Sequence, residues 1–465
     1  MTGAAAWPAA ADAQITSPDY CHWFDENGNW TSLAGCHRYD PEAAVKYSDT
    51  YAENPNTSYF PTYASDCANF VSQTLMAGGH AFMFLNEPDI PQPVVYDSQM
   101  EWWSYRDPAG GMYNSGRTRS WSLIDDLYAF LNVNSPYTIG WLVHYPGSLA
   151  DVPQVDMPFD PWSEVWEAER VDAPISSVIV YQWEITPEQI AEGSFSPDHT
   201  AIAVARGTDP GSGWSDLLVD AHTTNRYHAI WHLIPYNAMF ASTAAAILAM
   251  GNTAIDLYGN ADRSVLRAPT VEPAGRTAAG ARLPRLKPPA SDVASTVVAG
   301  DGLTPEQDLA VRSAFESAMA TRQRVAVSDS ALTAPATTAR SDEVPHHAAG
   351  HGRTQLASLF TAQQLTREIH NLDAAVELRL RESVRALDGG AESFRYTASA
   401  LQANGDVVLR GSFRAWAKVG QAQPDGDLVP AQPSNVINFV STLRQAGGAW
   451  KVAALTWEFA SGNEP

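Results

Sequence analysis

The stretch YASDCANFVSQTLMAGG, residues 63 to 79, decides how this sequence is interpreted. Its apolar side chains recur at helical spacing on one side, which carries Phe70, Val71, Thr74 and Leu75. The Gly78-Gly79 pair ends the pattern, so we predict a short amphipathic helix with Cys67 in its first turn. That placement leaves three hypotheses for the thiol: a buried apolar side chain, a disulfide partner or a nucleophile.

A thiol becomes a strong nucleophile when it ionises, and the N-terminus of a helix favours the thiolate. Ser65 and Asp66 are the candidates for the helix cap and the oxyanion site, where the Cys67 backbone N–H is the expected donor. Such a cysteine also needs a histidine that moves protons and a third polar group that orients the imidazole.

Two histidines stand at the ends of predicted strands. The segment PDHTAIAV places His199 at the start of one strand, and LLVDAHTTN places His222 at the end of the next. Adjacent antiparallel strands are expected to bring them into register at one edge of a sheet. We therefore predict His199 as the base and His222 as the third member, with Asp220 and Asn225 as its alternatives. The plainer interpretation is a satisfied histidine at a strand end.

The chain has 3 cysteines, and two of them flank a turn signal in CHWFDENGNWTSLAGC. The Asn27-Gly28 pair predicts a β-hairpin with Cys21 and Cys36 near its ends. A Cys21–Cys36 disulfide is the favoured hypothesis; it would leave Cys67 as the odd thiol and would imply an oxidising compartment. Reduced thiols and a zinc site stay open, although adjacent Cys-His residues on a strand point to opposite faces.

Composition disfavours several classes of function. The 465 residues carry a net charge of −23, which disfavours binding to nucleic acid or to an anionic membrane. No apolar run reaches the roughly 18 residues of a membrane-spanning helix. Residues 1–20 predict a flexible arm and do not make a complete signal peptide. The low-complexity segment with His346, His347 and His351 favours a solvated loop over a metal site, and we expect no metal or cofactor.

The pattern along the chain predicts two α+β domains. Residues 21–255 hold helical patterns, followed by strand patterns; the helices are expected at 40–54, 65–79 and 120–133, and the strands at 176–183, 199–207 and 216–223. Residues 256–302 are rich in Pro, Ala and Arg and lack apolar periodicity, which is typical of a linker. Trp102, Trp103 and Trp121 are expected in the core and not as platforms for sugars.

Residues 303–465 predict the second α+β domain. Helical patterns at 304–323 and 361–385 flank a low-complexity stretch at 327–352. A four-strand antiparallel meander is expected after them, with strands at 393–403, 406–419, 435–445 and 449–460. This arrangement resembles the cone-shaped, nuclear-transport-factor-like folds.

The segment from Tyr39 to Gly79 resembles the putative amidase domain family of Gram-positive bacteria. It carries the family's Tyr-Asp-x-x-Ala-Ala-Val-x-Tyr helix, an Asn-Pro run with one extra residue, and Asp-Cys-x-Asn-Phe-Val-Ser-Gln from Asp66. Further elements match over residues 38–240: EWWSY, SWSLIDDLYAFL, VIVYQW, the His-Thr-x-Ile strand at His199, and Ala-His-Thr-x-Asn at 221–225. One departure is SSVIVYQW, where relatives show Gly-Asp before the strand.

The family resembles NlpC-type and CHAP peptidases of the papain-like clan, so the resemblance implies a papain-like cysteine amidase domain. It implies Cys67 as the nucleophile, His199 as the base and His222 as the orienting residue in amide hydrolysis through a thioester. It also implies a peptide or peptidoglycan substrate and a protein that is secreted or associated with the cell wall.

Two alternatives stay open. A catalytically idle papain-like domain would serve as a binding or scaffold module, and the sequence does not identify the partner of the C-terminal domain. An acyltransferase would keep the same scaffold and pass the acyl group to an amine instead of water.

Overall fold

We describe the chain from a computed structural model. The structure describes residues 21–24, 30–33, 39–57, 60–80, 95–96, 101–102, 104–105, 116–134, 138–144, 173, 175–186, 188–189, 195–250, 302–325, 344–381, 384–423 and 427–465. The predicted arm at 1–20 and the predicted linker up to residue 301 lie outside these residues, as do Cys36, the Asn27-Gly28 turn and Trp103.

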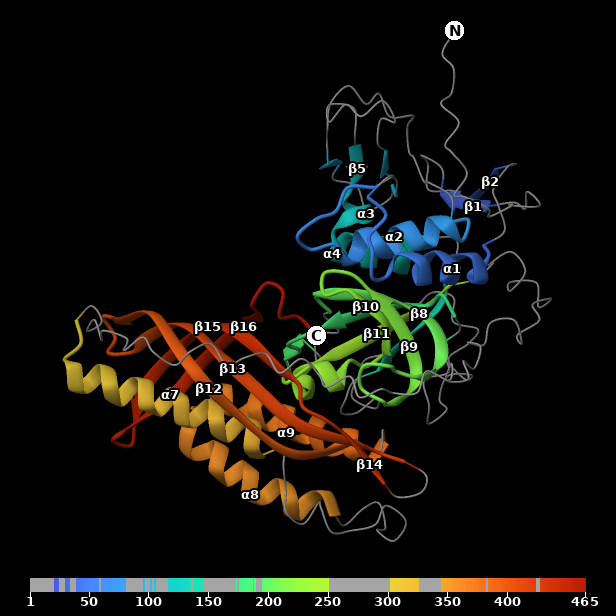
Figure 1. Cartoon of the computed structure of the whole chain (residues 1–465). Coiled ribbons are helices and arrows are strands. Elements are labelled where there is room, and N and C mark those ends of the chain that lie inside the picture. Colours follow the sequence, from blue (N-terminus) through green and yellow to red (C-terminus); the bar gives the residue numbers. More distant parts are fainter. Residues whose placement is uncertain are drawn as a thin grey trace.

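A six-stranded antiparallel sheet forms the centre of the first region (Figure 1). Its strands lie in the order β10-β9-β8-β7-β11-β6. Their bounds are β6 (Thr138–His144), β7 (Val178–Gln182), β8 (His199–Thr208), β9 (Ser215–Ala221), β10 (Arg226–Ile230) and β11 (Ala244–Met250). The strands predicted at 176–183, 199–207 and 216–223 are confirmed. Every side chain of β7 and β11 is buried, so both faces of the sheet are covered.

Helices cover one face of this sheet (Figure 1). They are α1 (Pro41–Tyr51), α2 (Cys67–Ala77), α3 (Arg119–Ser122) and α4 (Ile124–Ala129). Phe70, Val71 and Leu75 of α2 pack in one apolar cluster with Ile202 and Val204 of β8. The amphipathic pattern of residues 63–79 therefore buries its apolar side against the sheet, as the sequence predicts.

The boundaries of α1 and α2 follow from their sequence. Asp40 caps α1, because its carboxylate accepts hydrogen bonds from the N–H groups of Glu42 and Ala43 at 3.0 and 3.1 Å. Pro41 stands in the first turn, where its missing N–H costs nothing. Gly79, beyond the end of α2, has a φ of 96°, a conformation that favours glycine.

The helix predicted at 120–133 is wrong as one continuous element. Leu123 separates α3 from α4, and its backbone is extended, with φ −115° and ψ 133°. A π-helical turn, η2 (Phe130–Asn134), follows α4. Across the break, Arg119 Nε donates to the Asp126 carboxylate at 2.9 Å, so a side-chain bond joins the two segments.

Two small sheets accompany the first region. Strands β1 (Cys21–Phe24) and β2 (Trp30–Leu33) pair antiparallel, which confirms the hairpin. The Cys21–Cys36 disulfide stays a prediction, because Cys36 is outside the described residues. In the other sheet, β5 (Gly116–Thr118) lies between β3 (Val95–Tyr96) and β4 (Ser104–Tyr105).

The C-terminal region consists of helices followed by a second antiparallel sheet. The helices are α7 (Pro305–Val325), α8 (Val344–Leu359) and α9 (Ala362–Arg381). The sheet has the order β12-β13-β15-β16, with β14 on β13; the bounds are β12 (Val384–Leu401), β13 (Val407–Ala422), β14 (Leu428–Ala431), β15 (Ser434–Ala446) and β16 (Ala449–Phe459). An antiparallel sheet in each region agrees with the predicted α+β class.

The C-terminal region differs from the sequence prediction in two places. The segment with His346, His347 and His351 belongs to helix α8 and is not a loop, because the helical turns run without a break from Val344 to Leu359. The sequence pattern does not predict the short strand β14, which pairs with the C-terminal half of β13 and extends the sheet there.

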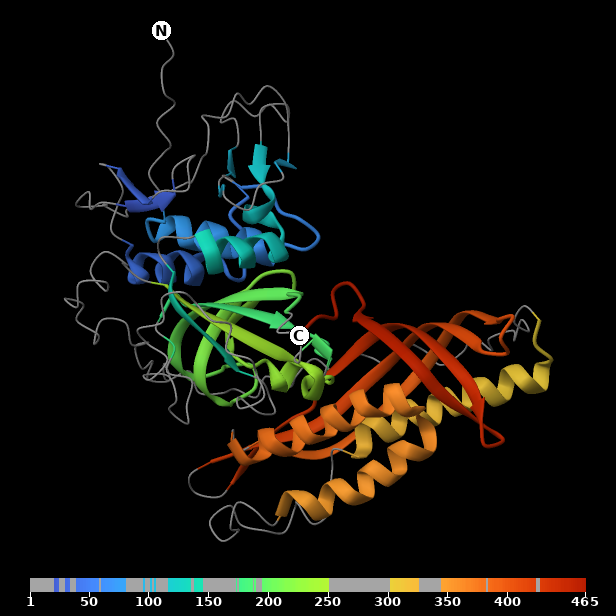
Figure 2. The same ribbon diagram turned by 180° about the vertical axis from the view of Figure 1, so that it is seen from behind.

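The C-terminal region packs against the other face of the six-stranded sheet (Figure 2). Trp183 of the first region and Phe459 of the second lie in one apolar cluster. The Gln421 amide also exchanges two hydrogen bonds with the backbone of Ser215, at 2.8 and 3.1 Å. The sheet is therefore the middle layer of the molecule, between the helices and the C-terminal region.

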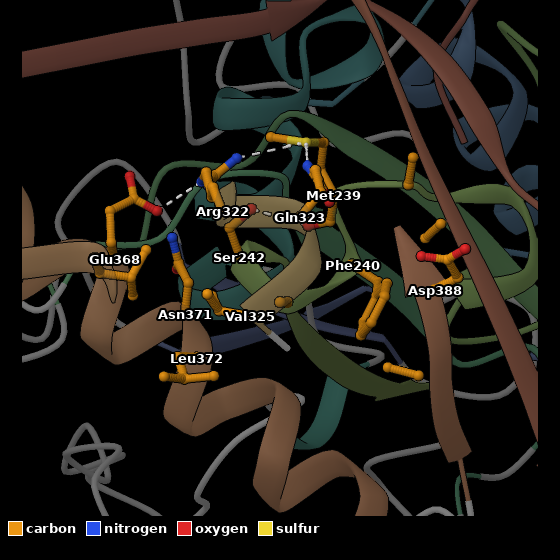
Figure 3. Close-up of a pocket in the computed structure, with 15 residues that line it drawn as sticks. Met239, Phe240, Ser242, Arg322, Gln323, Val325, Glu368, Asn371, Leu372 and Asp388 are labelled. Carbon is orange, nitrogen blue, oxygen red and sulfur yellow. Dashed lines mark hydrogen bonds and ion pairs between the residues drawn. The ribbon is translucent and has the colours of Figure 1, made fainter. Parts of the chain in front are cut away.

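A cavity of about 40 Å³ lies in the seam between the two regions (Figure 3). Met239 and Phe240 line it from the first region, and Arg322 and Glu368 line it from the second. The Arg322 guanidinium pairs with the Glu368 carboxylate at 2.6 Å. A space of this size holds a few water molecules and no organic substrate, so we assign the seam a structural role.

Candidate functional site

Cys67 is the first residue of α2 and is buried, with 2% of its surface exposed. Burial raises the pKa of the Cys67 thiol above its ordinary value. Nearby donors oppose this rise without overcoming it; they are the N–H groups of Thr200 and Ala68 and the hydroxyls of Ser65 and Thr223. The thiol therefore lies between the first turn of α2 and the start of β8, in surroundings that keep it protonated.

Asp66 directly precedes Cys67 and joins several segments. It occupies the N-cap position of α2, but its side chain makes no hydrogen bond to the helix N–H groups. Its Oδ1 instead accepts from the Tyr63 N–H at 3.0 Å and from Asn69 Nδ2 at 2.9 Å. Its own N–H donates to the Thr223 hydroxyl at 3.0 Å. Asp66 thereby ties the first turn of α2 to the turn that follows β9.

His222 makes the second contact of Asp66. Its Nδ1 lies 2.9 Å from Asp66 Oδ2, and its Nε2 lies 2.8 Å from the carbonyl oxygen of Tyr51. The imidazole stacks on the ring of Phe70, with 3.9 Å between the centroids. His222 is therefore fixed beneath the first turns of α2, with both nitrogens engaged.

His199 lies in a different environment. Its imidazole stacks on Trp183 and Tyr181, at centroid distances of 5.5 and 5.8 Å. Burial lowers the pKa of His199 to about 3, and the positive charge of Arg226 adds to this effect. Its Nε2 is buried and has no hydrogen-bond partner among the residues that the structure describes. His199 is thus a neutral imidazole held between aromatic rings.

The pairing of β8 with β9 explains why the two histidines are apart. Ile202 lies opposite Asp220, so continuing this register places Thr200, and not His199, opposite His222. Side chains alternate along a strand, and His199 and His222 therefore face opposite sides of the sheet. The ring contacts of the two histidines agree with this placement.

The structure brings some predicted site residues together and separates others. Cys67, Asp66 and His222 share one cluster, with Ser65 at its edge. Among the described residues, no hydrogen bond joins Cys67 to either His199 or His222. The alternatives for the third member also bind elsewhere: Asp220 accepts from the Ser48 hydroxyl and the His228 N–H, and Asn225 donates to the Glu53 carbonyl.

One group of side chains has the spacing of metal ligands. Atoms of Asp49, Asp220 and His228 lie within 4.8 Å of one another. His228 Nε2 is 2.9 Å from Asp49 Oδ1, and both Asp220 oxygens accept hydrogen bonds, so the group satisfies itself. We assign no metal ligand here.

Polar residues of the motif around Cys67 form a network of hydrogen bonds. Asn69 Oδ1 accepts from the Trp121 indole N–H at 2.8 Å. Ser72 Oγ donates to the Trp121 carbonyl and accepts from the Trp102 indole N–H at 3.1 Å. Gln73 Oε1 accepts from the Tyr47 hydroxyl at 2.8 Å.

The expectation that Trp102 and Trp121 are core residues is confirmed, since both are fully buried.

Sequence reasoning missed three contributors to the site. Thr223, the Tyr51 carbonyl and the ring of Phe70 all contact the Asp66–His222 unit or the thiol. Thr223 could have been found from its position beside His222. The contribution of Tyr51 is a backbone oxygen, so its side chain carries no signal for it.

Comparison with known proteins finds one family model that is similar to part of the first region. Residues 38–243 match the family model described as a putative amidase domain. No curated protein matches the chain, and no solved structure does. The match indicates a hydrolase of amide bonds in general terms. In the part of the chain that the structure describes, no helix combines the length and apolarity needed to cross a membrane.

Proposed function

We propose that the first region is a cysteine amidase in which Cys67 is the nucleophile, His199 the base and His222 the third member. The observation that carries the proposal is the position of Cys67 at the N-terminus of α2, beside the Thr200 N–H, within a segment that matches an amidase family. A helix N-terminus and convergent N–H donors are what a thiolate requires.

In the proposed reaction, His199 takes the thiol proton and the Cys67 sulfur attacks the amide carbonyl carbon. The Cys67 backbone N–H donates to the developing oxyanion. The C–N bond then breaks, the His199 imidazolium gives its proton to the leaving amine, and a thioester remains. Water that has lost a proton to His199 attacks this thioester, the C–S bond breaks, and the thiol regains its proton.

In this proposal the described arrangement is a resting state. The thiol is protonated and the His199 imidazole is neutral, but both pKa shifts oppose the first proton transfer, so turnover requires surroundings that raise the pKa of His199 and lower that of the thiol. His199 faces Trp183 and Tyr181 on the side of the sheet away from α2, so the backbone at the start of β8 has to rearrange before its imidazole reaches the sulfur.

We propose peptides, and peptidoglycan stem peptides in particular, as the substrate class, for a secreted or cell-wall-associated protein with a papain-like domain. Support comes from the family match and from the order of the motifs, with the cysteine first and the histidines later. Acyl transfer would share the first half of the reaction and differ only in the acceptor of the thioester.

A second candidate function has one observation in its favour. The Cys67 thiol is buried, and no described histidine is hydrogen-bonded to it. A catalytically idle binding module would show this arrangement permanently, whereas an amidase would leave it during turnover.

The two functions are distinguished by labelling the full chain with an electrophilic thiol probe and mapping the adduct by peptide mass spectrometry. We expect an adduct on Cys67, release of amines from purified peptidoglycan, and loss of both in Cys67→Ala with the fold intact by circular dichroism. His199→Ala should retain slow labelling and lose hydrolysis. Hydrolysis by Cys67→Ala at the wild-type rate would exclude the cysteine mechanism, and no labelling or turnover by the wild type would favour the idle module.

A further inference from the structure

We propose that Asp66 and His222 form a buried carboxylate–imidazolium pair and that Asp66, acting through His222, is the positioning residue for Cys67. The positioning half of this inference rests on the proposed function, because it takes Cys67 as the nucleophile. The other part of the inference, the charged state of Asp66 and His222, does not depend on any activity.

The two ring nitrogens of His222 decide its protonation. Nε2 faces the carbonyl oxygen of Tyr51 at 2.8 Å, and a carbonyl oxygen can only accept, so Nε2 carries a proton. Nδ1 faces a carboxylate oxygen of Asp66 at 2.9 Å. One proton lies between these two atoms, either on the imidazole as a charged pair or on the carboxyl as a neutral pair.

The other contacts of Asp66 favour the charged pair. Its Oδ1 already accepts two hydrogen bonds, from the Tyr63 N–H and the Asn69 amide. Hydrogen bonds that are donated to a carboxylate stabilise its ionised form. Asp66 also stands at the N-terminus of α2, where the helix dipole favours negative charge.

The surroundings of His222 favour a cation in the same way. Tyr51, whose carbonyl oxygen accepts from Nε2, is the last residue of α1, and the C-terminal end of a helix attracts positive charge. The face of Phe70 covers the imidazole, and an aromatic face favours a cation over a neutral ring. The imidazolium thus lies between the negative end of α1 and a carboxylate at the positive end of α2.

The pair fixes the start of α2 from three directions. It joins the end of α1 through Tyr51, the turn after β9 through His222, and the first turn of α2 through Asp66. The Asp66 N–H donates to Thr223, whose hydroxyl is also close to the Cys67 thiol. Loss of the pair therefore frees the turn that carries the sulfur.

This role differs from that of the orienting residue in a cysteine–histidine triad. With both N–H groups donated to oxygen atoms, His222 has no lone pair left to accept a hydrogen bond from His199. The third member of the site therefore acts on the nucleophile and its helix, and not on the base.

The protonation is tested by ¹⁵N NMR of the full chain with ¹⁵N-labelled histidine at pH 7.5, with His222 assigned by the signal lost in His222→Gln. We expect two protonated nitrogens in the wild type. In Asp66→Asn the amide oxygen can keep the Tyr63 and Asn69 bonds while its NH₂ donates to Nδ1, so His222 should show one unprotonated nitrogen. An unprotonated Nδ1 in the wild type would overturn the charged pair.

The positioning role is tested by the kinetics of the same variants. Asp66→Ala removes the hydrogen bonds, so kcat should fall about 10²-fold with little change in KM. Asp66→Asn retains the bonds and should restore kcat close to the wild-type value, while its ¹⁵N spectrum stays altered. An unchanged kcat in a folded Asp66→Ala would overturn the positioning role. If the wild type neither hydrolyses amides nor reacts with the probe, the proposed function fails, and two protonated nitrogens on His222 would still establish the pair.

Discussion

Phe459 of the C-terminal region packs edge-on against Trp183 of the first region, with 5.6 Å between the ring centroids. Trp183 in turn stacks on His199, so the second region reaches the predicted base through one intermediate ring. Glu464, which follows Phe459 in the chain, makes a separate contact with the first region, because its carbonyl oxygen accepts a hydrogen bond from the Thr224 hydroxyl at 3.1 Å. The C-terminal region therefore contributes to the surroundings of His199.

The first prediction concerns this contact. Phe459→Ala removes a buried ring, so we expect a loss of about 3–5 kcal/mol of unfolding free energy, measured by urea titration. Trp183 gains freedom, and the Cys67 thiol should react several times faster with iodoacetamide under conditions where the protein remains folded. Leu309→Ala is the matched control, because Leu309 lies on α7 with 69% of its surface exposed. Equal labelling rates in Phe459→Ala and the wild type would show that this contact does not limit access.

The second prediction concerns the network beneath α2. Asn69 is fully buried and hydrogen-bonds the Trp121 indole, the Asp66 carboxylate and the Pro61 carbonyl. Asn69→Ala leaves these groups without this partner, so we expect a loss of roughly 2–3 kcal/mol in a urea titration. Asn225→Ala removes one exposed hydrogen bond, to the Glu53 carbonyl, and should change stability by less than about 0.5 kcal/mol. Similar losses in the two variants would contradict the role of the network.

Local signals account for the elements that could be predicted from the sequence. The Asp40 cap, the following Pro41 and the glycines after α2 specify helix ends through interactions within a few residues. The strands β7, β8 and β9 are short apolar runs between turn residues, a pattern that also depends on near neighbours. These features can therefore be predicted from the sequence alone.

The position of His222 relative to His199 depends on a feature that the sequence does not reveal. The register of β8 and β9 shifts by one residue at a bulge between Ala203 and Ala205. Without that shift His222 would lie opposite Ala201 and share the face of His199, which is the arrangement predicted from the sequence. A one-residue slip moves a side chain to the other face of a sheet. The contact of His222 with Asp66 follows from this slip and joins residues 156 positions apart.

The third prediction concerns the dependence of the first region on the second. Trp183 and Trp231 belong to the apolar cluster that the two regions share. Residues 21–255 produced alone would expose this face of the sheet, so we expect aggregation or strong binding of a hydrophobic dye. Light scattering and dye fluorescence against the full chain provide the measurement. A soluble monomer that binds no dye would show that the first region is stable by itself.

The fourth prediction concerns Glu184, which lies at the boundary of the two regions. Burial raises the pKa of Glu184 to about 7; the charges of Arg322 and Arg367 oppose this rise, and Glu368 adds to it. A carboxyl whose pKa is raised by folding contributes stability below its ordinary pKa, and that contribution is lost as the pH rises through about 7. The wild type should therefore lose stability between pH 5 and pH 8.

Glu184→Gln isolates this effect, because its amide resembles the protonated carboxyl at every pH. We expect the variant and the wild type to have similar Tm values near pH 5 and the variant to be more stable at pH 8, by roughly 2–4 °C for each kcal/mol recovered. Glu188→Gln is the matched control: Glu188 is exposed and pairs with Arg367 at 3.5 Å, so its loss should alter Tm little at either pH. A Glu184→Gln variant less stable than the wild type at pH 8 would mean that the arginines hold Glu184 ionised in the folded protein.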